Sequence, residues 1–156
     1  MSTVADQLLD LLDIEQLEID LFRGMGNGGE TTTRIFGGHV IAQALMAAYR
    51  TVPDRLCHSL HAYFIRPGDP EIPVIYQVDR ARDGGSFTTR RVVAIQHGKQ
   101  IFNLSASFHI DEDGWDYQHE MPQVGSPEDW PNRNELRQSH VAKIPEKFHD
   151  DFLRER

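Results

Sequence analysis

The chain concentrates positive charge around one glycine-rich turn. Between residues 79 and 92, four arginines flank Gly84-Gly85-Ser86: Arg80, Arg82, Arg90 and Arg91. Guanidinium groups bind phosphate through paired N–H donors, and glycine lets a ligand approach the backbone closely. This run could therefore receive a phosphorylated ligand. The alternative is that these arginines only keep one face of the protein soluble, and the sequence leaves both interpretations open.

A second candidate site is the dipeptide Gly37-Gly38, which follows Phe36 and precedes a strongly helical run. The first N–H groups of a helix lack intrahelical partners, so they could polarise a carbonyl or hold an anion. The two glycines could equally serve only to let the helix enter a tight sheet. Gln43 interrupts the same apolar run, and a buried amide costs free energy unless its donor and acceptor are both satisfied. Gln43 is thus either a packing device, which we favour, or a binding residue.

Several other motifs match a functional pattern only superficially. Gly24, Gly26 and Gly29 satisfy the dinucleotide-binding spacing G-x-G-x-x-G. That motif must open a helix within a βαβ unit, whereas the threonine-rich residues 31–33 favour helix poorly and no such unit follows. We therefore expect a flexible loop at these glycines.

Metal and nucleophile chemistry also find little support in the sequence. His58 and His61 are three residues apart in a strand-like segment, a spacing that points the two rings to opposite faces. No third ligand stands at a recognised spacing, so we predict no metal site. The single cysteine, Cys57, lies in an apolar stretch typical of a small buried filler. Neither Ser86 nor Ser126 lies in a G-x-S-x-G motif.

The overall charge excludes one class of partner. The chain has 16 Lys and Arg against 24 Asp and Glu, a net charge of −8, although residues 34–110 hold 9 bases and 5 acids. Such an acid excess argues against nucleic-acid binding. No apolar run approaches the roughly 20 residues that span a bilayer. The start lacks a signal-peptide pattern, and with a single cysteine this favours a cytoplasmic location.

The elements that must position these residues follow from the periodicity of the apolar side chains. Leucines at helical spacing predict a short amphipathic helix over about residues 4–12. Leu17, Ile19 and Leu21 alternate with acidic residues, which predicts one strand with one face exposed to solvent. Residues 38–50 are apolar on nearly all sides, so the helix that they form must be buried.

Four further strands are predicted at about residues 57–66, 72–82, 86–97 and 100–110, separated by tight turns. We interpret them as an antiparallel meander. One face of the last strand is apolar and consists of Phe102, Leu104, Ala106, Phe108 and Ile110. Only a curled sheet could cover so apolar a helix. The predicted class is therefore α+β: a hotdog fold, with an antiparallel sheet of about five to six strands wrapped around one long buried helix.

The domain boundary is predicted where the composition changes. Residues 1–112 form the N-terminal hotdog, and residues 113–156 form an acidic, proline-rich linker with short helices. Ile144, Phe148 and Phe152 recur every four residues on a final helix that begins near Pro145. No Gly or Pro closes that helix, so we expect the helix to be cut rather than finished.

Four blocks, in order and at matching spacing, carry a resemblance to a known family. They are residues 36–45 (FGGHVIAQAL), 58–69 (HSLHAYFIRPGD), 82–92 (RDGGSFTTRRV) and 96–102 (QHGKQIF). The sequence resembles bacterial acyl-CoA thioesterase II from about residue 6 to the end. His39 is a departure, because the family more often has Gln there.

The resemblance implies a double hotdog about twice as long as this chain, of which this is the N-terminal half. Residues 113–156 would then be the linker that leads to a second hotdog absent from this chain. It further implies hydrolysis of fatty acyl-CoA to free fatty acid and CoA by water that an Asp, a Thr or Ser, and a Gln of the second half activate. No catalytic residue is then expected in this half, and residues 34–50 indeed contain no Asp or Glu. No cofactor is implied beyond the CoA of the substrate. The substrate-binding candidates are Gly37, Gly38, Gln43, His58, Arg82, Gly84, Ser86 and Arg90.

The expected partners are acyl-CoA and either the second hotdog domain or another copy of this chain. We expect the chain alone to self-associate and to be inactive or weakly active. A non-catalytic acyl-CoA binding or assembly module remains the main alternative. A hotdog enoyl hydratase or dehydratase is a weaker one, because no acid pairs with a His in the expected setting.

Overall fold

The computed structural model describes residues 3–26 and 33–153. The chain divides into two compact units, residues 1–113 and residues 114–156. The first unit contains the sheet and its helix, and the second contains short helices.

The first helix, α1 (Val4–Leu12), has the predicted bounds. Its N-terminus is closed by a capping box, in which Oγ1 of Thr3 accepts from the N–H of Asp6 and Oδ2 of Asp6 accepts from the N–H of Thr3. No residue of α1 is fully buried, as expected for an amphipathic helix on the surface.

The single strand predicted around Leu17–Leu21 is wrong, because the chain turns back within it. Residues Glu15–Glu18 form β1 and residues Leu21–Gly24 form β2, and the two strands pair antiparallel. The alternation of Leu17 and Ile19 therefore does not mark one buried face, and both side chains are exposed. The buried anchor of this hairpin is Phe22, with none of its surface exposed.

The central helix α2 (Gly37–Tyr49) lies against the sheet, as predicted. Its fully buried positions recur at helical spacing, and they are His39, Val40, Gln43, Ala44, Ala47 and Ala48. The small alanine side chains let the helix backbone approach the strands closely. This face is the centre of the hydrophobic core.

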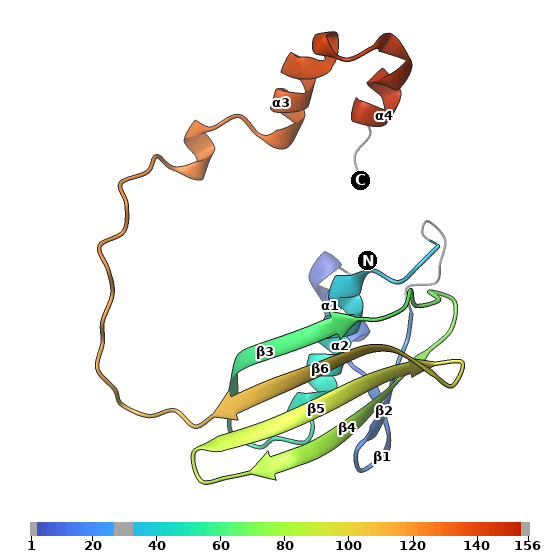
Figure 1. Cartoon of the computed structure of the whole chain (residues 1–156), viewed down its shortest axis with the longest axis vertical. Coiled ribbons are helices and arrows are strands. Elements are labelled where there is room, and N and C mark those ends of the chain that lie inside the picture. The colour runs from blue at the N-terminus through green and yellow to red at the C-terminus, as the bar shows by residue number, and fades with distance from the viewer. Residues whose placement is uncertain (1–2, 27–32, 154–156) are drawn as a thin grey trace. The chain divides into compact units, whose positions relative to one another are not determined.

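The four long strands are β3 (Leu56–Phe64), β4 (Val74–Asp83), β5 (Phe87–Gln96) and β6 (Lys99–His109). The antiparallel six-stranded sheet has the order β1-β2-β4-β5-β6-β3 (Figure 1). Only β4, β5 and β6 form the predicted meander. β3 pairs with β6 at the far edge instead of with β4, so the four strands are not consecutive neighbours.

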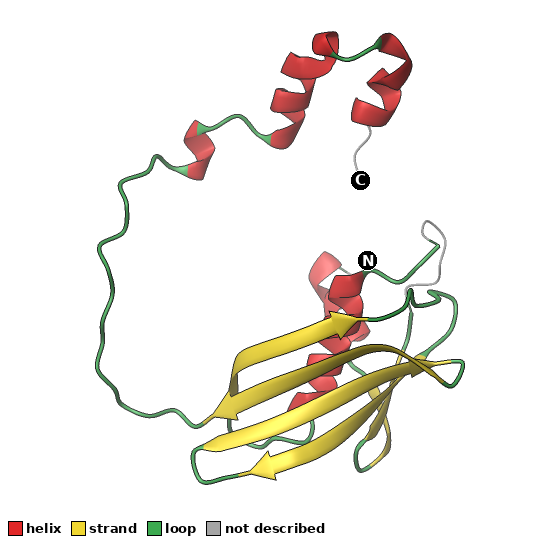
Figure 2. Ribbon diagram, viewed as in Figure 1, coloured by secondary structure: helices red, strands yellow, loops and turns green. Residues whose placement is uncertain are grey.

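The inner face of the sheet follows the alternation predicted for the last strand. Phe102, Leu104, Ala106 and Phe108 of β6 are all buried, whereas Ser105 between them is exposed. Phe22 of β2, Tyr76 of β4 and Val92 of β5 belong to the same buried core. The result is one helix packed on the concave side of one sheet (Figure 2).

Over its described residues, 114–153, the second unit contains two α-helices, α3 (Arg133–His140) and α4 (His149–Leu153). Three short 3₁₀ turns accompany them, Pro127–Asp129, Val141–Lys143 and Glu146–Phe148. The helix predicted to begin near Pro145 thus begins as a 3₁₀ turn, and its residue Phe148 is 49% exposed. Within residues 3–26 and 33–153, no helix is long and apolar enough to cross a membrane.

Candidate functional site

Apart from Gln43, which lies in the middle of α2, the candidate binding residues divide into two groups at opposite ends of this helix. Gly37 and Gly38 open this helix. The β4–β5 turn lies at the other end of the helix, near Thr51, which follows the last residues of α2. There Nε of Arg90 in β5 donates a hydrogen bond to Oγ1 of Thr51 at 2.8 Å. A helix of 13 residues spans about 20 Å at 1.5 Å per residue. Only an elongated ligand could touch both groups.

Arg90 does not form the phosphate contact predicted for it. Its side chain is 1% exposed, and all of its N–H groups have acceptors within the protein. Nε and Nη2 donate to the side chain and the carbonyl of Thr51, and Nη2 also reaches Oδ1 of Asp83 at 2.6 Å. Nη1 donates to the carbonyls of Arg82 and Thr89. Because no donor remains for a ligand, Arg90 holds the turn together.

Arg55 is a functional neighbour that the sequence reasoning missed. Its Nη2 donates to the carbonyls of Gly84 and Gly85 at 2.9 and 2.8 Å, and its Nη1 donates to Oγ1 of Thr88 at 2.6 Å. Arg55 and Arg90 therefore fix the glycine-rich turn to the loop between α2 and β3. No local motif surrounds Arg55, since the contact joins segments about 30 residues apart in the chain.

Arg82 remains available for a ligand at this turn. Its side chain is exposed and makes no ion pair among the residues that the structure describes, and Gly84 lies close to it. Ser86 is half-buried, and its carbonyl accepts from the N–H of Ile110. The hydrogen bond from Arg90 lowers the pKa of Asp83, so this carboxylate stays charged. The positive charge that faces solvent here is therefore mainly that of Arg82.

His58 lies on the outer face of the sheet, beside the start of β5. Its Nε2 is 2.8 Å from Oγ of Ser107, and its ring contacts those of Phe87 and His109. The predicted opposite orientation of His58 and His61 is wrong. A β-bulge between Cys57 and Ser59 adds one residue to β3, so both histidines lie on the outer face. The described residues contain no group of three or more His, Cys, Asp or Glu side chains that could hold a metal ion.

Aromatic rings cover the glycines at the start of α2. A Cβ atom on Gly37 would lie 3.0 Å from the ring of Phe64, and one on Gly38 would clash with the ring of Phe36. The close approach that these glycines permit is thus made by the protein itself. This geometry favours the packing interpretation of Gly37 and Gly38. Phe36 and Phe64 are nevertheless 73% and 60% exposed, so they present an apolar surface at this end of α2.

Gln43 is held in the core by a complete set of hydrogen bonds. Its Nε2 donates to the carbonyls of Leu11 at 2.7 Å and Met25 at 3.2 Å, and its Oε1 accepts from the hydroxyl of Tyr76 at 2.9 Å. The side chain is 1% exposed, and Gly24 in β2 leaves room for it. Gln43 therefore joins α1, α2 and β4, as the packing alternative requires, and offers no free atom to a ligand. Of the three glycines in the G-x-G-x-x-G pattern, Gly29 lies outside the described residues.

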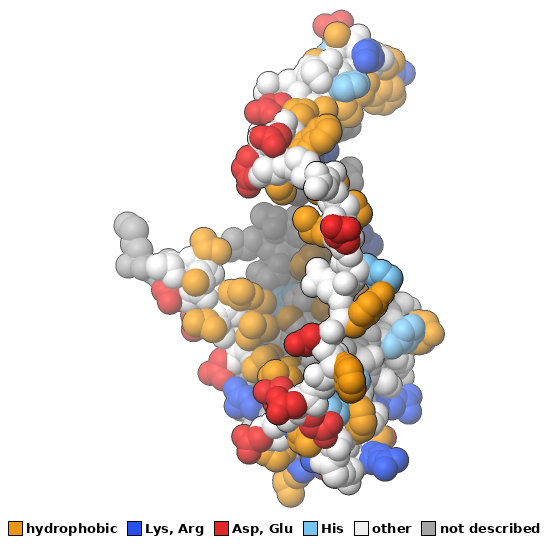
Figure 3. Space-filling model, turned by 90° about the vertical axis from the view of Figure 1, so that its left-hand side faces the viewer, with side chains coloured by type: hydrophobic (Ala, Val, Ile, Leu, Met, Phe, Trp, Pro, Cys, Tyr) orange, Lys and Arg blue, Asp and Glu red, His pale blue; other side chains and the backbone are white. Residues whose placement is uncertain are grey.

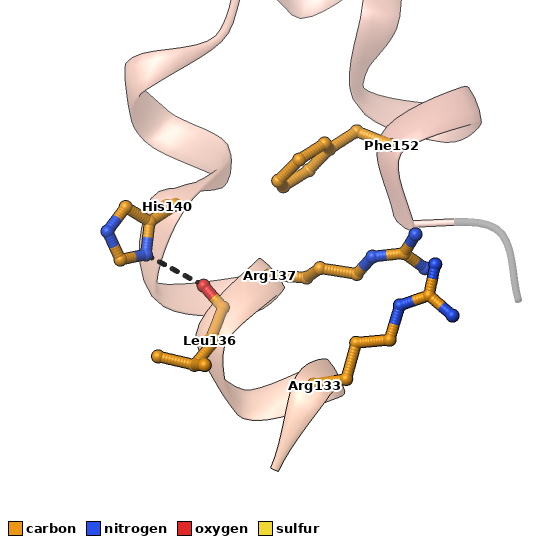
Figure 4. A pocket seen from close by; sticks show the side chains of 5 residues that line it. All are labelled: Arg133, Leu136, Arg137, His140 and Phe152. Atoms are coloured by element: carbon orange, nitrogen blue, oxygen red, sulfur yellow. Dashed lines mark hydrogen bonds between the residues drawn. The ribbon is translucent and has the colours of Figure 1, made fainter. Parts of the chain in front are cut away.

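A shallow hollow of about 430 Å³ lies between α3 and α4 in the second unit (Figure 4). Arg133, Leu136, Arg137, His140 and Phe152 line it. The guanidinium of Arg137 lies 5.8 Å from the centre of the Phe152 ring. None of these residues except Phe152 was singled out in the sequence, because the hollow depends on how α4 folds back on α3.

Comparison with known protein families identifies the segment that contains α2 and the β4–β5 turn. The model of a family described as "Acyl-CoA thioesterase N-terminal domain" matches residues 28–109. The chain belongs to this family. The matched segment includes α2 and all four long strands. It therefore contains both ends of the helix and the β4–β5 turn that Arg55 and Arg90 hold in place.

Curated relatives extend the match over the whole chain. Acyl-CoA thioesterase 2 of Haemophilus influenzae is 41% identical over an alignment of 157 positions that covers 100% of this chain and 54% of that protein. An acyl-CoA thioesterase II from Mycobacterium marinum, 47% identical, superposes with a TM-score of 0.69 over 80% of this chain and 47% of its own. The chain therefore spans about half the length of such relatives.

The fold is confirmed as a hotdog. A protein from Alicyclobacillus acidocaldarius described as having a hot dog fold superposes with a TM-score of 0.66 at 25% identity, over 78% of this chain and 47% of its own. The predicted class, an antiparallel sheet around one long helix, is correct. The resemblance to acyl-CoA thioesterase II is also confirmed.

Proposed function

We propose that this chain is the N-terminal hotdog of a cytoplasmic acyl-CoA thioesterase that acts in lipid metabolism. The proposed reaction is hydrolysis. Water attacks the thioester carbonyl carbon, the C–S bond breaks, and CoA leaves as a thiolate that takes up a proton. The family match over both ends of α2 carries this proposal. No cofactor is needed beyond the CoA that the substrate itself brings.

We assign substrate binding, and not the chemical step, to this half. A general base must reach the attacking water, and α2 contains no Asp or Glu. His39, the one titratable side chain on its first turn, is buried and contacts the Met25 carbonyl at 3.0 Å. What the half can offer is the exposed charge of Arg82 and the apolar surface of Phe36 and Phe64. An acyl-CoA, with phosphates at one end and an acyl chain at the other, matches these two regions.

The partner in this proposal is a second hotdog unit. β3 is an edge strand of the sheet, and along it Leu56, Tyr63 and Phe64 are 72%, 62% and 60% exposed. A long edge with exposed apolar side chains is a template for pairing with another strand. We infer that a second hotdog pairs along this edge and supplies the missing catalytic groups.

The test compares this chain with a longer one that contains the second half. Release of free CoA thiol is measured with a panel of saturated acyl-CoAs. We expect turnover by the longer chain and little or none by the short one. Robust turnover by the short chain would overturn the need for a second half.

A second arm of the same test distinguishes the main alternative, an acyl-CoA binding or assembly module. The absence of an acid on α2 is the observation that favours it. Calorimetric titration with a non-hydrolysable acyl-CoA should show binding to both chains. Binding without turnover by the longer chain would replace the enzyme proposal with the binding module.

A further inference from the structure

The β4–β5 turn presents two backbone N–H groups on one side. Nη2 of Arg55 donates to the carbonyls of Gly84 and Gly85 at 2.9 and 2.8 Å. In a trans peptide unit the carbonyl and the N–H that follows it point in opposite directions, and the described residues contain no cis peptide bond. The N–H groups of Gly85 and Ser86 therefore point away from Arg55. Neither of these two N–H groups has an acceptor within the part of the chain that the structure describes.

Arg55 approaches this turn from the inner side of the sheet. Its Nη1 donates to Oγ1 of Thr88, a side chain that is buried under the sheet. Asp83 turns to the same side, because its Oδ1 accepts from the buried Arg90. Successive side chains of a strand point to opposite faces, so Arg82 projects from the outer side. The two N–H groups and the guanidinium of Arg82 thus share the outer side of the turn.

The outer side of the turn leaves room for a ligand. A Cβ atom on Gly85 would meet nothing within 4 Å, and this glycine is exposed. A Cβ atom on Gly84 would lie 3.3 Å from Nε of Arg82, so the guanidinium lies close to the backbone of the turn. Consecutive N–H groups that point the same way beside an arginine are an arrangement that binds phosphate.

Phe87 adds an aromatic surface next to these donors. It follows Ser86 directly, and its ring lies on the outer face because the neighbouring Thr88 is buried. The ring is 50% exposed and packs on His109, with ring centres 4.3 Å apart. Exposed aromatic rings are surfaces on which nucleic-acid bases stack. A phosphate site beside such a ring fits a nucleotide better than a bare phosphate.

The acidic side chains at this end of the sheet leave Arg82 without a partner. Figure 3 looks onto the end of the sheet that carries this turn, and both basic and acidic side chains reach the surface there. Asp83 is paired with Arg90. Residues 111–113 are all acidic and follow β6, and the strand order places β5 between β6 and Arg82. No ion pair of Arg82 occurs among the described residues.

We propose that the outer side of the β4–β5 turn binds the nucleotide end of CoA. The N–H groups of Gly85 and Ser86 and the guanidinium of Arg82 hold its phosphates, and the adenine stacks on Phe87. Arg55 is the positioning residue, which touches no substrate and acts by turning the two N–H groups outward. The inference rests on the proposed function and deepens it, because it states which part of the substrate this turn recognises.

Calorimetric titration with three probes tests the assignment. The probes are a non-hydrolysable acyl-CoA, the matching acyl-pantetheine analogue without the nucleotide, and the free nucleotide, adenosine 3′,5′-bisphosphate. We expect the free nucleotide to bind alone, and the acyl-CoA analogue to bind at least about tenfold tighter than the acyl-pantetheine analogue. Equal affinities of the two thioester analogues would overturn the proposal. Inorganic phosphate that binds as tightly as the free nucleotide would also overturn it, since the turn would then be a general anion site.

Two substitutions of Gly85 provide a matched pair. The space around this position accepts either side chain, and both have nearly the same size. Gly85→Asp places a carboxylate beside the phosphates and should weaken binding of the acyl-CoA analogue about tenfold, most strongly at low salt. Gly85→Asn adds no charge and should stay within about threefold. Equal losses in the two variants would overturn the proposal.

The positioning role of Arg55 needs a readout that a loss of stability would not produce. Arg55→Met frees the two carbonyls of the turn. It should weaken binding of the acyl-CoA analogue and of the free nucleotide about tenfold, and leave binding of the acyl-pantetheine analogue unchanged. A residue that only stabilises the fold would affect both thioester analogues equally, and that result would overturn the positioning role. Should this variant fail to fold, the two Gly85 variants still decide whether phosphates bind at the turn.

The outcome is separable from that of the proposed function. Binding of the acyl-pantetheine analogue depends on the apolar region of the hotdog unit and not on the β4–β5 turn. Absence of binding by both thioester analogues would contradict the proposed function. Binding of both with equal affinity would leave the proposed function in place and overturn only the nucleotide site.

Discussion

Arg90 in β5 donates from Nη2 to Oδ1 of Asp83 at 2.6 Å, and this ion pair joins a side chain that is 1% exposed to one that is 59% exposed. The charge of Arg90 is thus buried while its counter-ion faces solvent. Most of the compensation for burying Arg90 comes from neutral acceptors, the carbonyls of Thr51, Arg82 and Thr89. Within the arginine-rich stretch, Arg90 therefore stabilises the structure from its buried position, whereas Arg82 and Arg91 present their charges to solvent.

We predict that Arg90→Met lowers the free energy of unfolding of the hotdog unit by about 2–4 kcal/mol. Several buried acceptors would lose their donor, and each unsatisfied polar group costs roughly 1–3 kcal/mol. Arg91→Met, one residue further along the strand on the exposed face, is the matched control and should change stability by less than about 0.5 kcal/mol. Urea unfolding followed by circular dichroism measures both. Similar effects of the two variants would contradict the structural role that we assign to Arg90.

The Gln43–Tyr76 pair gives a second stability prediction. Burial raises the pKa of Tyr76, so its hydroxyl stays protonated and donates to Oε1 of Gln43. Tyr76→Phe should cost about 1–2 kcal/mol, and Gln43→Leu should cost more, because it also leaves the carbonyls of Leu11 and Met25 without this donor. The double variant should cost less than the sum, as expected for residues in direct contact. Strict additivity in the unfolding free energies would show that the two side chains act independently.

Stability should fall when the protein is acidified through the range where histidine titrates. Burial lowers the pKa of His39 below its ordinary value of 6.5, although its bond to the Met25 carbonyl acts in the opposite sense. Between the folded pKa and 6.5, the unfolded chain binds a proton there that the folded chain does not. Unfolding is therefore favoured as the pH drops below about 6.5. Thermal unfolding between pH 7.5 and 5 measures this, and His39→Gln should have a flatter profile. If stability depends on pH equally strongly in His39→Gln and in the unaltered chain, groups other than His39 cause the dependence.

Arg82 should matter for ligand binding and not for stability. Arg82→Gln is expected to weaken binding of a non-hydrolysable acyl-CoA about tenfold, the loss typical of one charge-assisted hydrogen bond to phosphate. Arg91→Gln, on the outer face of the sheet, is the control and should bind normally. Calorimetric titration gives both dissociation constants. Should both variants bind like the unaltered chain, the phosphates lie elsewhere.

The elements themselves were largely readable from the sequence because they depend on local periodicity. The apolar alternation of β6 and the almost wholly apolar run of α2 each allowed one structure only. The β1–β2 hairpin was missed because the turn at Ile19 and Asp20 contains no Gly or Pro, and the alternation of Leu17, Ile19 and Leu21 continues through it. The bulge that brings His58 and His61 to one face also leaves no mark in the residue types.

By itself, the sequence determined the class of fold, the family and the absence of an acid on α2, since these depend on residue types and their spacing along the chain. Only the tertiary structure decided which arginine is buried. β5 has apolar residues on both faces, Val92 and Ala94 on one and Val93 and Ile95 on the other, so alternation could not tell which face turns inward. Pairing of Val92 with Val78 and Leu104 made that choice, and it buried Arg90 and left Arg91 in solvent. Such register is set by contacts between distant segments, which no local pattern records.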